Sequence, residues 1–120
     1  MAKRTNRAGV KKNRKPSVVL TRRAPGTSLV VLRRGSAIGR VTVLNKEFSI
    51  ETEDVGTLRI KTKAINTIVL KNGPLFPLDV VRLRSGDISG TVTTDPVKIE
   101  SDQIGGKKDI PLAQILTISF

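Results

Sequence analysis

The residues of this sequence that are best suited to chemistry are its cations, and most of them lie in one acid-free segment. The chain has 22 Lys or Arg against 10 Asp or Glu in 120 residues, a formal net charge of +12. The twelve cations of residues 1–40, which hold no carboxylate, are Lys3, Arg4, Arg7, Lys11, Lys12, Arg14, Lys15, Arg22, Arg23, Arg33, Arg34 and Arg40. Residues 41–120 carry ten cations and ten carboxylates. A separated block of positive charge predicts a polyanionic partner for that block.

Cations of this kind bind phosphates and release the counterions that the phosphates hold. If about six phosphates of a duplex were contacted, log affinity would fall with log salt with a slope of about −5. Phosphate contacts position a protein without reading sequence, so the binding should tolerate any sequence. DNA, RNA and an acidic protein all remain open as the partner. A solubilising or targeting tail is the alternative interpretation.

Carboxylates form the second group of candidates. Glu51, Glu53 and Asp54 lie close together, and Glu100 and Asp102 repeat the spacing of the first two. Paired carboxylates can hold Ca²⁺ or Mg²⁺, or act as acid and base. We favour solvated strand ends and expect no metal site. A second possibility is that this rim meets the basic segment of a neighbouring copy.

The missing residue types exclude much other chemistry. The chain has no His, Cys, Trp or Tyr. It therefore lacks the usual zinc ligands, a Cys or Ser–His nucleophile, haem or iron–sulfur ligands and disulfides. Its aromatic residues are Phe48, Phe76 and Phe120, too few for a base-stacking surface. We expect no enzyme, no cofactor and no small-molecule substrate.

The elements that would position these residues come from an internal duplication. Residues 29–70 and 79–120 align, with Gly35 and Gly39 matching Gly86 and Gly90 at the same spacing. Further matched pairs are Val41 with Val92, Phe48 with Val97, Leu70 with Phe120, and Ile60, Ile65 and Ile68 with Ile110, Ile115 and Ile118. Phe48 and Phe120 are therefore expected in a core or interface, and only Phe76 has no such match.

Each repeat shows the pattern of β-strands. Apolar and polar residues alternate at Val41 and Val43, Phe48 and Ile50, Leu58 and Ile60, and Val97 and Ile99. Glycines mark the turns, including Gly56, Gly105 and Gly106 between the third and fourth strands. At about 42 residues a repeat, five short strands fit. The predicted fold is all-β, with two tandem copies of a small five-stranded barrel.

The predicted domains are a disordered basic arm over 1–26, one barrel over 27–72, a linker over 73–78 and a second barrel over 79–120. The arm contains Pro16 and Pro25 and little apolar periodicity, so it cannot bury enough surface to order itself. The linker contains Leu75, Phe76 and Leu78, which are too apolar for a free connection. We expect it to pack across both repeats.

The apolar skeleton of both repeats resembles the Sm-like small β-barrel, a relative of SH3-like barrels. Gly39, Val41, Asn45 and residues 48–50 fall at the spacings of the first Sm motif. Residues 60–68 and 110–118 both fall on the second motif, Ile-Arg-Gly-x-x-Ile-x-x-Ile. The resemblance implies barrel geometry in each repeat over residues 29–120. An unrelated SH3-like barrel would show much the same skeleton.

The polar positions depart from the Sm-like pattern. The family's Asp is Asn45, its Asn is Ser49, and its Arg-Gly is Lys61-Thr62; the second repeat has Lys98 and Pro111-Leu112 there. Those positions form the RNA base pocket in the family, so pocket-type recognition is not expected here. Residues 86–90 also resemble the Gly-Asp-x-x-x-Gly strand modules found ahead of some bacterial outer-membrane barrels.

The end of the sequence predicts self-association. Ile118, Ser119 and Phe120 continue an apolar strand without a polar cap, and open strands pair with other strands. We therefore expect a homo-oligomer joined through strand edges. No apolar run approaches a membrane span or a signal peptide, so we expect no membrane partner and a cytoplasmic location, or a place inside a virion.

These observations predict a non-enzymatic, sequence-tolerant nucleic-acid-binding protein, with a basic arm on a self-associating β-barrel body. The alternative is a structural assembly subunit of a capsid, virion or filament. Its basic arm would contact genome or a neighbouring subunit.

Overall fold

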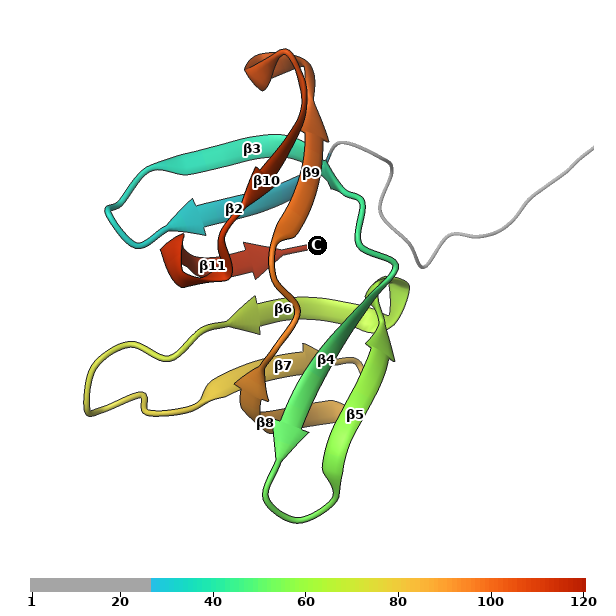
Figure 1. Ribbon diagram of the computed structural model, residues 1–120, viewed down its shortest axis with the longest axis vertical. Helices are drawn as coiled ribbons and strands as arrows, with labels where there is room; N and C mark the ends of the chain where they lie inside the picture. The colour runs from blue at the N-terminus through green and yellow to red at the C-terminus, as the bar shows by residue number, and fades with distance from the viewer. Residues whose placement is uncertain (1–26) are drawn as a thin grey trace, which may run out of the picture.

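The computed structural model describes residues 27–120, which form ten β-strands and three short 3₁₀ turns (Figure 1). The all-β prediction is confirmed. The disorder predicted for residues 1–26 lies outside the described residues.

Each repeat supplies five strands. The first repeat forms β2 (Ser28–Leu32), β3 (Ala37–Val43), β4 (Glu47–Thr52), β5 (Gly56–Lys61) and β6 (Ile65–Val69). The second forms β7 (Asp79–Leu83), β8 (Gly86–Val92), β9 (Val97–Ser101), β10 (Gly106–Ile110) and β11 (Ile115–Ser119). The 3₁₀ turns are η2 (Thr62–Ala64), η3 (Asp102–Ile104) and η4 (Leu112–Gln114). The glycine turns hold as predicted, because Gly56, Gly105 and Gly106 have φ values of 75°, 78° and 125°.

All ten strands join one antiparallel sheet in the order β10-β9-β3-β2-β11-β6-β7-β8-β4-β5. One half of the sheet consists of β2 and β3 from the first repeat with β9, β10 and β11 from the second. The other half consists of β7 and β8 with β4, β5 and β6. The repeats therefore exchange strands, and the two halves appear one above the other in Figure 1. The expected pair of closed tandem barrels is not confirmed, since the sheet is not closed.

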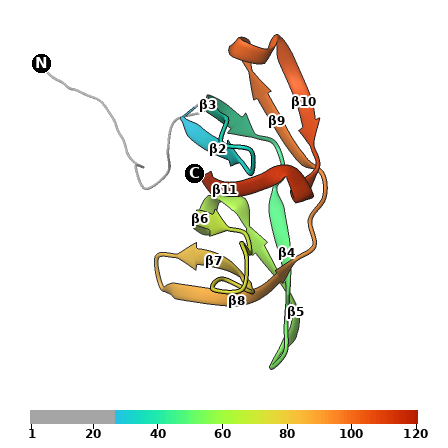
Figure 2. The ribbon, with the colours of Figure 1, turned by 90° about the vertical axis from the view of Figure 1, so that its left-hand side faces the viewer.

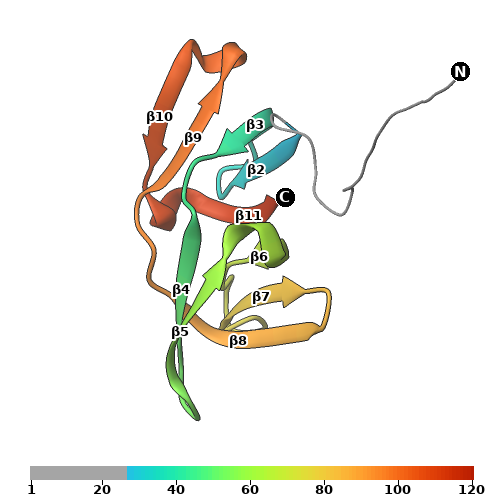
Figure 3. The same ribbon diagram turned by 90° about the vertical axis from the view of Figure 1, so that its right-hand side faces the viewer.

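Two connections carry the exchange: residues 44–46 lead from β3 to β4, and residues 93–96 lead from β8 to β9. Figures 2 and 3 show both connections crossing between the halves on the same side of the molecule. They are tied by hydrogen bonds that mirror each other. The Leu44 N–H donates to the Lys98 carbonyl at 2.7 Å, and the Thr93 N–H donates to the Ser49 carbonyl at 2.9 Å. The two halves thus repeat one arrangement.

The core consists of the inward residues of both halves. Val30, Val41, Val81, Val97, Ile99, Ile115 and Ile118 are fully buried. Phe48 and Phe120 are 1% and 9% exposed, and their rings pack edge to face with centroids 5.9 Å apart. The expectation that both are core or interface residues is confirmed.

The linker differs from its prediction. Leu75, Phe76 and Leu78 are 85%, 62% and 52% exposed, so the expected packing across both repeats is wrong. The loop instead closes on itself, because the Asn72 N–H donates to the Phe76 carbonyl at 2.8 Å and Gly73 turns at φ 70°. The loop joins β6 to β7 and projects to the left of these strands in Figure 1.

Asp79 holds this loop to the sheet. Its carboxylate, on a residue only 4% exposed, accepts hydrogen bonds from the backbone N–H groups of Lys71 and Val92, both at 2.7 Å. We predict that Asp79→Ala lowers the free energy of unfolding by about 3 kcal/mol, because it leaves two N–H donors without their acceptor. Urea denaturation followed by circular dichroism measures this loss.

The matched control for Asp79→Ala is Asp87→Ala. Asp87 is exposed and lies 3.9 Å from Arg82 in a surface ion pair. Its removal should cost less than about 1 kcal/mol, as is usual for such pairs. Equal losses in the two variants would contradict the role given to Asp79.

Candidate nucleic-acid interface

Of the twelve predicted cations, nine fall in residues 1–26 and lie outside the described residues. Arg33 and Arg34 lie in the turn after β2, and Arg40 lies in β3. All three are exposed. The structure therefore locates only the last three of the predicted nucleic-acid-binding residues.

The Arg33 side chain forms hydrogen bonds within the fold. Its Nε donates to the Ala113 carbonyl at 3.1 Å, and its Nη2 donates to the Lys71 carbonyl at 2.7 Å. Its backbone N–H also donates to the Gln114 carbonyl at 2.9 Å. Arg33 therefore has fewer donors left for a phosphate.

The described cations of this set are not placed together by β2 itself. Thr27, the first described residue, directly precedes β2, whereas Arg33 and Arg34 follow its last residue. A five-residue strand spans about 17 Å, so Thr27 and this turn lie at opposite ends of β2. Figure 1 shows the turn on the same side as the projecting linker loop.

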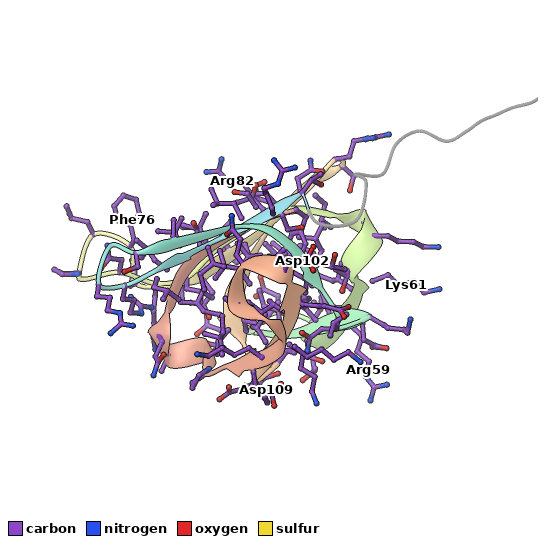
Figure 4. All side chains as sticks on the ribbon, turned by 90° about the horizontal axis from the view of Figure 1, so that it is seen from above. Arg59, Lys61, Phe76, Arg82, Asp102 and Asp109 are labelled. Carbon is purple, nitrogen blue, oxygen red and sulfur yellow. The ribbon has the colours of Figure 1, made fainter. Side chains whose placement is uncertain are left out.

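The sequence analysis did not single out the cations near the start of β6, which is level with the start of β2. An open hollow of about 370 Å³ is lined by Lys63, Ala64, Asn66, Leu83, Arg84 and Ser85, and we call it the basic hollow. Lys63 belongs to η2, and Arg84 lies in the turn after β7. Figure 4 shows Arg59 and Lys61, which precede η2, pointing outward at the side opposite Phe76. The net neutrality of residues 41–120 concealed this local excess, although Arg84 matches Arg33 in the repeat alignment.

The polar positions of the Sm-like resemblance serve the strand exchange. The Asn45 side chain accepts from the Lys98 N–H at 2.7 Å and donates to the Pro96 carbonyl at 3.3 Å. The Thr94 hydroxyl accepts from the Ser49 N–H at 2.8 Å. The Asn45 amide is therefore occupied by backbone groups of the other repeat and is not free to line a base pocket. At Ser49 the bond is made by the backbone N–H.

The structure places Ile118, Ser119 and Phe120 in the middle of the sheet. Strand β11 pairs with β2 on one side and β6 on the other, and the Phe120 N–H donates to the Asn66 carbonyl at 3.0 Å. The open edge expected at these residues is therefore not observed, because the last strand of each repeat pairs with its counterpart. The free edges of the described sheet are β5 and β10. Self-association itself stays a prediction.

The candidate carboxylates lie on the surface. Glu51, Glu53, Asp54, Glu100 and Asp102 are all exposed. Within residues 27–120, no group of three or more possible ligand residues could hold a metal ion. In the same part of the chain, no helix is long and apolar enough to cross a membrane.

Comparisons with known proteins leave the chain without an assigned relative, since no family model, curated protein or solved structure matches it. The Sm-like resemblance therefore stays a prediction.

Proposed function

We propose that this chain is a non-enzymatic protein that binds nucleic acid through its basic arm, with little preference for sequence. The observation that carries the proposal is the charge distribution, with twelve cations and no carboxylate in residues 1–40. The described residues support it, because Thr27, the residue that follows the arm, precedes β2 on the side of the sheet where β6 begins and where the basic hollow lies. The body would act as a rigid support built from two exchanged small-barrel units.

The chemistry of the body favours backbone contacts over base reading. Phe48 and Phe120 are buried, and Phe76 is the one exposed aromatic residue of the three. A single exposed ring cannot form the row of stacking platforms that single-strand binders use. Lys and Arg contacts to phosphates should therefore dominate the affinity, which makes it strongly dependent on salt. The cytoplasm, or the interior of a virion, would supply such a partner.

The experiment that tests this function removes residues 1–26. We predict that the shortened chain binds a fluorescent 20-base-pair duplex about 100-fold or more weakly at low salt, because nine cations are lost. Fluorescence anisotropy gives the affinity, and circular dichroism checks that the β-sheet remains. Retained affinity in the shortened chain would contradict the proposal.

A full-length variant with residues 1–26 in scrambled order is the matched control. It keeps every charge of the arm but not the order, so phosphate binding should survive within about threefold. A loss as large as that of the deletion would show that the arm is read as a specific segment rather than as charge.

The assembly alternative has one observation in its favour, the two free sheet edges at β5 and β10. Both edges carry neighbouring cations, Arg59 and Lys61 on one and Lys107 and Lys108 on the other. Charged edge residues oppose edge-to-edge pairing, so copies would need a polyanion to bring these edges together. Light scattering with and without duplex separates the two functions, since large particles formed by the protein alone would favour the assembly subunit.

A further inference from the structure

The two halves of the sheet carry an arginine at equivalent positions, Arg33 and Arg84, and within the described residues only the Arg33 side chain is bonded to the fold. The repeat alignment matches Arg84 with Arg33, Lys63 with Ala113, and Asn66 with Leu116. Arg33 donates to the carbonyls of Ala113 and Lys71. In the basic hollow, neither the Arg84 nor the Lys63 side chain makes a hydrogen bond or ion pair with another residue of the described part of the chain.

The basic hollow is suited to an anion. Two cations, an amide and a hydroxyl line it, and no carboxylate does. The nearby Asp87 on β8 is already paired with Arg82, at 3.9 Å. The hollow is open to solvent and has a volume of about 370 Å³, so a phosphate group can approach its two cations from outside.

The first described residues, which follow the arm in sequence, lie close to this hollow. Leu29 of β2, Ser119 of β11 and Thr67 of β6 face one another across three adjacent strands. Two strand spacings are about 10 Å, so the first residues of β2 lie about that far from Asn66 at the hollow's rim. A polyanion held by the arm would be presented to the basic hollow.

We propose that Lys63 and Arg84 bind a backbone phosphate of the nucleic acid that the arm holds. This inference rests on the proposed function and adds to it a fixed contact on the folded body. Arg84 would supply a forked pair of N–H donors and Lys63 a point charge, the two usual ways in which proteins hold phosphate. Asn66 and Ser85 would donate further hydrogen bonds.

The test compares two full-length double variants that lose the same charge. Lys63→Gln with Arg84→Gln alters the basic hollow, whereas Lys107→Gln with Lys108→Gln alters exposed cations on the edge strand β10. For the first, we expect about tenfold weaker duplex binding and a salt slope shallower by about one unit. The β10 variant should lose less than about threefold and keep the slope. Equal losses in the two variants would overturn the proposal.

Backbone amide shifts in nuclear magnetic resonance spectra give a second measurement that needs no substitution. Added duplex should shift the amide signals of Asn66 and Ser85 and leave that of Lys108 unchanged. Shifts that are absent from Asn66 and Ser85 while the chain binds duplex would overturn the hollow contact but leave the proposed function standing. A wild-type chain that binds no duplex at all would overturn both.

Discussion

Gly90→Ala should destabilise the fold by about 3 kcal/mol or more, since overpacking against backbone is among the costliest core changes. Gly90 is a buried residue of β8, the strand that pairs with β4 of the other repeat. A Cβ at Gly90 would overlap the carbonyl oxygen of Glu51 and lie 3.2 Å from the Ile50 Cγ1. Backbone atoms cannot move aside as a flexible side chain can, so β4 and β8 would have to separate.

Gly39→Ala provides a control at the matching position of the first repeat. A Cβ at Gly39 meets only the Leu29 Cδ1, at 3.7 Å, which is an ordinary van der Waals distance. We expect a change within about 1 kcal/mol, because the lower entropy of the unfolded chain offsets any small packing cost. Urea denaturation of both variants measures the contrast. Similar losses at Gly39 and Gly90 would contradict the close approach of β4 to β8.

The contrast between Gly39 and Gly90 also shows which part of the fold could not be predicted from the sequence. The repeat alignment makes the two glycines equivalent, and only the structure separates them. Local patterns predicted the strands correctly, because alternation and glycine turns depend on residues near in sequence. The choice between pairing within a repeat and pairing between repeats depends on distant strands, which present the same apolar faces in either arrangement.

A local signal marks the hairpins but not the exchange. Gly56 is the first residue of β5 and Gly105 directly precedes β10, so both the β4–β5 and the β9–β10 hairpins have a glycine at the turn. Tight hairpin turns favour residues that accept positive φ. The connections 44–46 and 93–96 contain no glycine and cross between the halves, but 62–64 and 111–114 also contain none and stay within one half. The absence of glycine therefore does not identify the connections that cross.

The candidate site was predictable only in part. Composition located the charge of residues 1–40, because a block of like charge is visible in any sequence. It could not separate Arg33, which is bound to two carbonyls, from Arg84, which has no such partner in the described residues. Lys63 stands where the other repeat has Ala113, and the Lys71 carbonyl that Arg33 also binds lies in the linker, outside the aligned repeats.

Cutting the chain in the linker loop should show the strand exchange directly. Between Gly73 and Pro74 the loop is exposed, and the fragments 27–73 and 74–120 each correspond to one repeat. Neither fragment contains the strands of one complete half, since β2 and β3 belong to one half and β4, β5 and β6 to the other. We predict that neither fragment alone folds as a monomer, and that an equimolar mixture regains the sheet.

Circular dichroism and native mass spectrometry of the fragments, alone and mixed, measure this result. A fragment alone can satisfy its strands only by exchange with a second copy of itself, so any folded form of it should be a dimer. Chains of this size are also marginal as single domains, because they bury too small a share of their surface. Two fragments that each fold as stable monomers would instead support tandem barrels, with every repeat pairing its own five strands, and would contradict the exchange.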